Sequence, residues 1–479
     1  MLTKLWKLAL GAVAAAALST GAVAAEKPKY GGTLVFVVAS EAPSWDGHIE
    51  TTFGTIHPIA PFYSLLVRVN PENPSDPTDI QCDVCESWSK SDDGLTYTFK
   101  IRHGITFHDG QKLTAADVVA TYHKIIWPPK GIRSAYKDFY VMVDSVEQTD
   151  DFTVVFKLKY PSGAFFPALA NPFNFIYSAQ DLKEHGYEWH QTHINGTGPF
   201  MFKSYDPGSS VTGVKNPNYF HKGKPYLDGF KALIATKMSA RVQAIESNRA
   251  MIEFRGFPPK QRDELKAALG DKITVQESDW NCVLIVTPNH RHPPFDNADA
   301  RRALTLAIDR WGGSKYLSKI AIVKTVGGIV YPNHPLAAKP EELEKIAGYS
   351  HDIEKSRAEA RALLKKAGVD LSKTYVFNNR GVDQPYKVVG TWLVDQWKKI
   401  GLNFEQQVNP SPVFYDILRK THKFDASIDF NCQSVINPIA DVSFFVPGSG
   451  SNWSGVKDDE LVKMYDELSR AATFDEQPL

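Results

Sequence analysis

The sequence has no excess of either charge, because its 54 lysines and arginines balance 54 aspartates and glutamates. A chain without net charge has no global field that would attract nucleic acid or an anionic membrane. The sequence also lacks internal repeats and low-complexity tracts. Hydrophobic residues make up 43% and charged residues 23% of its 479 positions, as in an ordinary globular protein of about two or three domains.

Motifs of the common enzyme classes are missing. The chain contains no G-x-S-x-G elbow, no H-E-x-x-H pair, no P-loop and no G-x-G-x-x-G that opens a helix. Single serines, histidines and aspartates are plentiful, but a triad is defined by spatial arrangement rather than by sequence position. The sequence therefore favours a protein that is not an enzyme and has no cofactor, with an exported hydrolase as the alternative.

Long apolar runs are also scarce, and the one at the N-terminus is typical of an export signal. Lys4 and Lys7 precede an apolar stretch over residues 8–18, and the residues AVA at 22–24 match a signal-peptidase site. The stretch is shorter than the roughly 20 residues that span a membrane, and no cysteine follows it for lipid attachment. We expect a cleaved signal peptide at residues 1–25 and a soluble periplasmic protein.

Only four cysteines are present, an even number that suggests disulfides in an exported protein. Cys82 and Cys85 form a C-x-x-C, which suits a tight disulfide, a redox motif or half of a zinc site. No thioredoxin-like strand and helix flank this motif, and no second C-x-x-C completes a zinc site. The spacing therefore favours a structural disulfide.

One H-x-H motif, His290-Arg-His292, offers two imidazoles that could bind zinc, nickel or copper. It precedes Pro293-Pro294 in a predicted loop, and no third ligand is evident in the sequence. The motif therefore favours a solvated loop without metal.

Strand and helix patterns alternate along the chain, which predicts α/β layers with mixed sheets. Residues 31–38 and 272–276 are predicted strands, and residues 352–367 form an amphipathic pattern that Gly368 ends. A compact unit lies over residues 86–119. There Leu95 to Arg102 alternate between apolar and polar residues, as in a half-buried strand.

The same unit ends in a helix start. Thr114 is a good N-cap, and Asp117 three positions later is a capping-box acid. The apolar stripe that follows ends at Pro128-Pro129. These residues by themselves predict structure and no chemistry.

The unit resembles the signature of the large solute-binding proteins of peptide/nickel-type ABC transporters. Three further blocks resemble that family in the same order: NGTGPF at 195–200, NPNY at 216–219 with PYLD at 225–228, and PPFD at 293–296 with RRALTLAIDR at 301–310. The resemblance implies a type II periplasmic binding protein, in which two lobes enclose a ligand cleft and an extra α/β subdomain is inserted.

The resemblance also implies domain boundaries. Residues 26–55 with 192–281 would form lobe I, residues 56–191 the inserted subdomain, and residues 282–479 lobe II. In the family the chain returns to lobe I at its C-terminal end. The last residues here resemble the start of the family's final helix, so this return would be missing.

By the same resemblance, the protein is a monomeric periplasmic component of an ABC importer that captures a peptide or peptide-like polar solute and delivers it to the permease subunits. The alternative on the same fold is a carrier of nickel or a metallophore. It would use His290, His292 or Trp280 with Arg380.

The resemblance further implies the site residues. Arg380 lies where an arginine anchors the substrate carboxylate in dipeptide-binding members, a task that suits its planar fork. Ser434 lies where the family has an aspartate for the ligand amine, which favours a neutral polar ligand. Asp429 lies nearby and could replace that aspartate. The remaining implied ligand contacts are Trp280, Glu41, Trp45, Asn431 and Gln433, and the implied disulfide joins Cys282 and Cys432.

Overall fold

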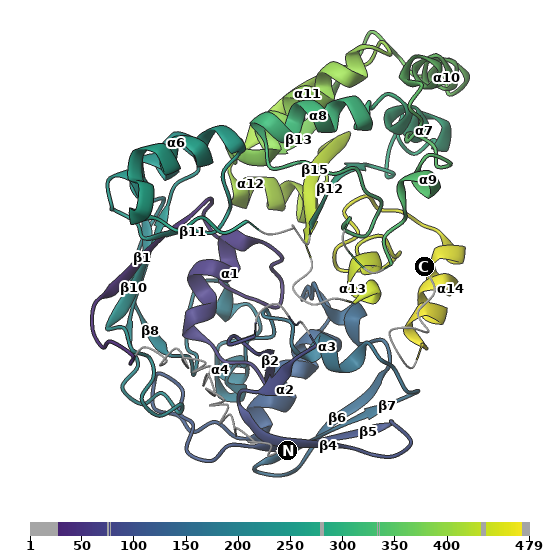
Figure 1. Ribbon diagram of the computed structural model, residues 1–479. Helices are drawn as coiled ribbons and strands as arrows, with labels where there is room; N and C mark the ends of the chain where they lie inside the picture. The colour runs from purple at the N-terminus through teal and green to yellow at the C-terminus, as the bar shows by residue number, and fades with distance from the viewer. Residues whose placement is uncertain are drawn as a thin grey trace, which may run out of the picture.

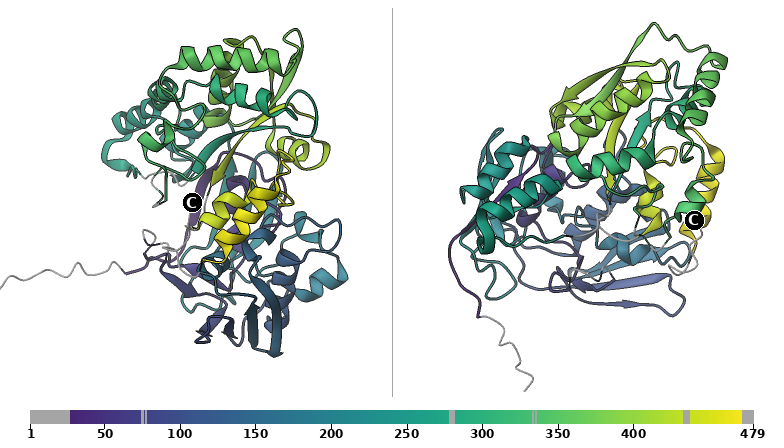
Figure 2. Two further views of the ribbon diagram at one scale, coloured as in Figure 1. Left: turned by 90° about the vertical axis from the view of Figure 1, so that its right-hand side faces the viewer. Right: turned by 45° about the horizontal axis from the view of Figure 1, so that its top comes forward.

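Figure 1 shows the computed structural model of the protein, which describes residues 27–73, 76, 78–277, 282–332, 334, 336–432 and 437–471. Two of its sheets contain both parallel and antiparallel strands, so the predicted mixed α/β architecture is confirmed. Figure 2 shows that the chain forms an upper body (green) and a lower body (purple to blue). No helix within the described residues has both the length and the apolar character needed to cross a membrane.

Lobe I is the part built on a five-stranded sheet in the order β11-β1-β10-β9-β8. Its strands are β1 (Thr33–Val38), β8 (Phe200–Asp206), β9 (Ser210–Lys215), β10 (Gly229–Ile234) and β11 (Ile252–Glu253). The strands β10 and β11 run parallel to β1, whereas β9 runs antiparallel to both of its neighbours. Helices α1 (Phe53–Ile59), α5 (Met238–Glu246) and α6 (Pro259–Leu269) belong to the same region. The sheet therefore joins the start of the chain to residues 200–253.

The inserted subdomain is the part built on an antiparallel sheet in the order β4-β5-β7-β6. Its strands are β4 (Cys85–Lys90), β5 (Thr96–Ile101), β6 (Val143–Asp150) and β7 (Thr153–Leu158). In β5 the alternate residues Tyr97, Phe99 and Ile101 are buried, which confirms the predicted half-buried strand. Helix α2 (Ala115–Ile126) covers this sheet and starts with the predicted capping box of Thr114 and Asp117.

Lobe II is the part built on a four-stranded sheet in the order β12-β15-β13-β14. Its strands are β12 (Cys282–Pro288), β13 (Thr374–Arg380), β14 (Asn403–Asn409) and β15 (Ala426–Cys432). The surrounding helices are α7 (Ala298–Leu306), α8 (Arg310–Ile320), α10 (Ile353–Lys366) and α11 (Val388–Lys398). Trp397 is fully buried between these layers, in a cluster with Phe377 and Phe404.

The remaining strands and α-helices lie between these parts or after them in the chain. They are β2 (Val67–Val69), β3 (Ile80–Cys82), α3 (Phe165–Leu169), α4 (Ala179–Glu184), α9 (Pro340–Leu343), α12 (Ser411–Asp416), α13 (Pro438–Ser443) and α14 (Asp459–Ser469). The helices α13 and α14 (yellow in Figure 1) add Ile439, Tyr465 and Leu468 to the apolar core of the inserted subdomain. The predicted range of lobe II, residues 282–479, therefore includes two helices that pack against another part of the molecule.

Both predicted cysteine pairs are bonded. Cys282 and Cys432 occupy facing positions on the antiparallel pair β12 and β15, with a Cα–Cα distance of 4.0 Å. Cys82 and Cys85 form a short-range disulfide at the edge of the inserted subdomain. The predicted strand at residues 272–276 is wrong, because the described chain makes no sheet pairing there after α6 ends.

The 40–52 segment, which follows β1, is fixed to the inserted subdomain by a buried ion pair. Lys124 Nζ on α2 donates to Asp46 Oδ2 at 2.6 Å, and both side chains are inaccessible to solvent. The Tyr177 hydroxyl donates to Asp46 Oδ1 at 2.9 Å, and the ring of His190 stacks on Tyr177 at 3.8 Å between centroids. A buried pair needs such added hydrogen bonds to offset its desolvation. The segment is consequently held in one position beside lobe II.

Candidate functional site

Arg380, at the end of β13, is buried where lobe II meets the 40–52 segment. A guanidinium has five N–H donors in a fixed fork, and here each of them donates to a side-chain hydroxyl. The acceptors are Ser411 for Nε (2.8 Å), Tyr386 and Tyr415 for Nη1 (3.3 Å each), and Ser40 (2.8 Å) and Thr52 (2.7 Å) for Nη2. Arg380 therefore joins lobe II to the segment that leaves lobe I.

This position bears on the predicted role of Arg380 as the anchor of a ligand carboxylate. All of its N–H donors have protein acceptors, so a ligand carboxylate would have to replace at least one of the hydroxyls. The role stays a prediction. Tyr415 also donates to Asp429 Oδ1 at 3.3 Å, so the Arg380 charge is linked to a carboxylate through one phenol. Burial raises the pKa of Asp429, and the Arg380 charge opposes this rise.

A second contact between the lobes joins Arg419 to Glu50. Arg419 follows α12 in lobe II, and its two Nη atoms donate to the two carboxylate oxygens of Glu50 at 2.7 and 2.8 Å. The Glu50 side chain is fully buried and that of Arg419 is 11% exposed. Ser44 Oγ donates to the same carboxylate at 2.8 Å. This bidentate geometry is the strongest arrangement available to an arginine and a carboxylate.

Arg133 of the inserted subdomain reaches the same junction. Its Nε donates to the Gly450 carbonyl at 3.0 Å, and its Nη1 donates to the Ile49 carbonyl. The guanidinium lies over the ring of Trp453, with Cζ 4.9 Å from the ring centroid. Three parts of the molecule therefore meet at the 40–52 segment.

Glu41 and Trp45 lie elsewhere, at the edge of the lobe I sheet. Glu41 Oε1 accepts hydrogen bonds from the Gly208 N–H at 2.9 Å and from the Tyr205 hydroxyl. The ring of Trp45 packs edge-on against Tyr205 at 5.2 Å. These two residues contact a common tyrosine of β8, whereas the N–H groups of Arg380 donate to other residues. Among the described residues, the structure therefore does not join Glu41 and Trp45 to Arg380.

Of the other predicted contacts, Asn431 lies near the end of β15. Asn431 is buried, and its Nδ2 donates to the Asp441 carbonyl at 3.0 Å. Trp280, Gln433 and Ser434 lie outside the described residues. Of the H-x-H motif, His292 Nε2 lies 3.1 Å from the Phe424 carbonyl, and the His290 backbone N–H donates to the Ser454 carbonyl. Within the described ranges, no three His, Cys, Asp or Glu side chains are placed to hold a metal ion.

Gln384, which the sequence did not single out, faces a cavity of about 350 Å³ between the lobes. Its side chain is 1% exposed, and neither amide atom has a hydrogen-bond partner among the described residues. The neighbouring Asp383 accepts a hydrogen bond from the Met238 N–H at the start of α5, which is another contact between lobes. The other lining residues are Pro258, Gln261, Ile320, Lys387, Val388 and Thr391. A buried amide without partners is costly and therefore needs an explanation, of which a bound ligand is one.

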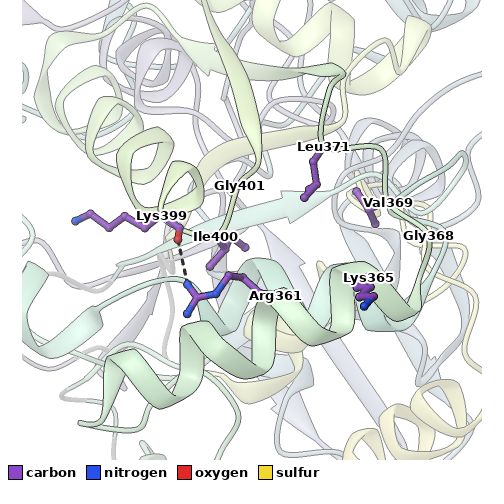
Figure 3. A pocket seen from close by; sticks show the side chains of 8 residues that line it. All are labelled: Arg361, Lys365, Gly368, Val369, Leu371, Lys399, Ile400 and Gly401. Carbon is purple, nitrogen blue, oxygen red and sulfur yellow. Dashed lines mark hydrogen bonds between the residues drawn. The ribbon is translucent and has the colours of Figure 1, made fainter.

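A second cavity, of about 620 Å³, lies on lobe II between the end of α10 and the turn into β14 (Figure 3). Arg361, Lys365 and Lys399 surround an apolar floor of Val369, Leu371 and Ile400. Arg361 Nη1 donates to the Lys399 carbonyl at 3.2 Å. The cavity shares no lining residue with the contacts between the lobes.

Residues 79–453 match the family model of bacterial extracellular solute-binding proteins, family 5. The chain belongs to this family. The family 5 protein is 30% identical over 306 residues to di/tripeptide-binding protein 2 of Pseudomonas aeruginosa, covering 60% of this chain and 55% of that protein. It is 31% identical over 366 residues to heme-binding protein A of Haemophilus influenzae, covering 71% of this chain and 62% of that one. The family 5 protein thus aligns with little more than half the length of these relatives.

The fold of the family 5 protein is shared with solved structures. It superposes on the murein tripeptide-binding protein of Escherichia coli with a TM-score of 0.81 at 19% identity, covering 94% of this chain and 88% of the other. The predicted type II binding-protein fold, with two lobes and an inserted subdomain, is confirmed by this similarity.

Several interacting residues of the family 5 protein could not be found by sequence reasoning. Glu50 and Arg419 are 369 positions apart, and nothing in either neighbourhood distinguishes them. Arg133 follows a Pro-rich turn without a motif. Gln384 precedes Pro385. The proline predicts a turn at this position but does not predict that the Gln384 amide is buried.

Proposed function

We propose that the protein is the periplasmic substrate-binding component of an ABC importer, which captures a peptide or peptide-like polar solute by lobe closure and delivers it to a permease. Family membership supports the class of function, and several relatives are named as peptide-binding proteins. The protein acts as a monomer and binds without covalent chemistry.

The observation that carries this proposal is the set of polar contacts between the lobes. Arg380 and Arg419 project from lobe II onto Ser40, Thr52 and Glu50. These contacts are hydrogen bonds and an ion pair rather than an apolar interface, so their groups can be solvated when the lobes separate. A closed form that is held by such contacts and by the ligand suits a hinge-bending binding protein.

The cavity beside Gln384 supports a polar ligand. Its walls come from α5 and α6 of lobe I and from α8 and α11 of lobe II, so closure would enclose its contents. An amide both donates and accepts, which matches the peptide group. Gln384 is therefore added to the predicted ligand contacts Arg380, Asn431, Trp280, Gln433, Ser434, Glu41 and Trp45.

Mass spectrometry of material that co-purifies after native export would identify the bound solute. Titration calorimetry with dipeptides and tripeptides, together with small-angle scattering, would then test closure. We expect binding, a smaller radius of gyration in the bound form and recovery of the peptide intact. Turnover of the peptide, or the absence of binding by any peptide, would contradict the proposal.

Gln384→Ala provides the local test. Loss of an amide that the ligand satisfies should weaken peptide binding by about two- to tenfold, because a buried hydrogen bond contributes about 0.5–1.5 kcal/mol, and by more where a ligand group is left unpaired. Gln180→Ala on the exposed face of α4 is the matched control and should leave affinity unchanged. Export is tested separately by N-terminal sequencing of the periplasmic protein, which should begin after the predicted 1–25 segment.

A further inference from the structure

The junction of the three parts holds more positive than negative charge. Arg133, Arg380 and Arg419 meet there, and the carboxylates linked to them are Glu50 and Asp429. Glu50 is occupied on both oxygens by Arg419. Within the described residues, this network therefore has one guanidinium more than it has carboxylates.

Aromatic rings separate the guanidinium groups. Arg133 and Arg419 both contact the ring of Trp453, with Cζ-to-centroid distances of 4.9 and 5.8 Å. The ring of Tyr415 lies between Arg419 and Arg380, at 4.7 and 5.2 Å. Ring faces partly compensate a cation but do not neutralise it. The alternation explains how like charges come close and leaves the net charge unchanged.

The surplus charge belongs to Arg133. Its hydrogen bonds go to two backbone carbonyls, and no carboxylate accepts from it in the described part of the chain. Burial and the nearby Arg419 charge lower the pKa of Arg133 to about 9. This environment disfavours the protonated form of the arginine. A bound anion beside Arg133 would stabilise that form.

Three N–H donors of the residues in this cluster are unused. Arg133 Nη2, Arg419 Nε and Trp453 Nε1 are buried and have no hydrogen-bond acceptor among the described residues. Trp453 is 5% exposed, so its indole N–H is not solvated in this form. Both guanidinium groups lie within 6 Å of the Trp453 ring centroid, so these three N–H groups belong to one cluster. Three unused donors and one uncompensated positive charge suit the oxygens and the charge of a single carboxylate.

We propose that the Arg133–Trp453–Arg419 corner binds a carboxylate of the captured solute in addition to any zwitterionic backbone, so that the natural ligand is an acidic peptide or peptide-like molecule with net negative charge. This inference rests on the proposed function and specifies its substrate class. Both carboxylates of the network are already engaged, so neither of them favours a ligand that brings a surplus cation.

Two dipeptides that differ in one group test the inference. Ala-Glu has a net charge of about −1 at neutral pH, and Ala-Gln replaces its side-chain carboxylate with an amide of the same shape. Calorimetry on the purified full chain should show Ala-Glu binding at least tenfold more tightly than Ala-Gln. Added salt should reduce this ratio, because the preference is electrostatic. Equal or tighter binding of Ala-Gln would overturn the inference while leaving the proposed function standing.

Two substitutions locate the effect. Arg133→Gln should reduce the Ala-Glu to Ala-Gln affinity ratio to about one, and Trp453→Phe, which keeps the ring and removes the N–H, should reduce it in part. Arg361→Gln, on the distant cavity of lobe II, should leave the ratio as in the wild type. Should Arg133→Gln fail to fold, the Trp453→Phe ratio and the salt dependence decide the question. A ratio that neither variant changes would contradict the assignment, and failure of every peptide to bind would contradict the proposed function as well.

Discussion

Arg419 holds both carboxylate oxygens of Glu50 from across the lobe boundary, at 2.7 and 2.8 Å. The pair is buried, so removing one partner leaves a charge that water cannot solvate while the lobes are closed. The contact therefore stabilises the folded protein and also holds the two lobes close together.

Glu50→Gln should lower the free energy of unfolding by about 3–5 kcal/mol, the usual cost of leaving one member of a buried pair unpaired. Because solvation of Arg419 requires separation of the lobes, small-angle scattering should also show a larger radius of gyration for the ligand-free variant. Urea unfolding measures the first effect. Asp395→Asn, which breaks the exposed Lys399–Asp395 pair, is the control and should cost less than about 1 kcal/mol. An equal loss in both variants would contradict a special role for Glu50.

Arg380→Met should destabilise the protein by about 3 kcal/mol or more, because it leaves several buried hydroxyls without their donor. Arg380→Lys should recover only part of this loss, since an ammonium lacks the planar fork that reaches five acceptors. Thermal and urea unfolding provide the measurement. The exposed Arg361→Met should change stability by no more than about 0.5 kcal/mol. Full stability in Arg380→Lys would show that charge alone matters at this position.

Stability should fall in mild acid because of His190. Burial, with the nearby Lys124 charge, lowers the pKa of His190 to about 3 from its ordinary value of 6.5. Between these values the unfolded chain binds a proton that the native protein does not, so the free energy of unfolding decreases as pH falls below about 6.5. The slope is about 1.4 kcal/mol per pH unit for each such histidine. Urea unfolding between pH 7.5 and 4.5 measures it.

His190→Phe keeps a ring against Tyr177 and removes the titrating group, so its stability should depend less steeply on pH than that of the wild type. His351→Phe, at a side chain that is 60% exposed, should leave the slope unchanged. Parallel curves for the wild type and His190→Phe would rule out a contribution from this histidine.

The two disulfides should differ in their contribution to stability. Replacing Cys282 and Cys432 with serine should cost about 2–5 kcal/mol, because that bond closes a loop of 150 residues in the unfolded chain. The same change at Cys82 and Cys85 should cost less, since only three positions separate them. Urea unfolding of the two double variants measures both losses of unfolding free energy. A larger loss for the Cys82 and Cys85 variant would show that local strain or packing dominates.

Secondary structure could be predicted from the sequence where the signals for an element lie within the element itself. The alternation from Leu95 to Arg102 and the Thr114 cap produce β5 and α2 as expected, because both signals lie within a few residues. The residues at 272–276 are apolar and polar in turn but find no partner strand, which their own sequence does not reveal. The family, the fold and the Cys282–Cys432 bond followed from resemblance rather than from any local rule.

The site was less predictable for a physical reason. Arg380 was identified, yet its five acceptors come from three separate stretches of chain. The partners of Glu50 and Arg133 depend on how three parts of the molecule pack, and a pairwise contact at such separation leaves no periodic signal in the sequence. Glu41 and Trp45 were assigned as ligand contacts by their position in the chain, and this stays a prediction; in the structure both contact Tyr205.

The 40–52 segment gives the inserted subdomain a part in lobe motion. Lys124 of the inserted subdomain forms an ion pair with Asp46, and Arg419 of lobe II forms one with Glu50. The two carboxylates lie four residues apart on the same segment. Any tilt of the inserted subdomain must therefore displace the surface on which lobe II closes. Substitutions in α2 that never touch a solute can in this way shift the balance between open and closed forms, so relatives could diverge in affinity while keeping every ligand contact the same.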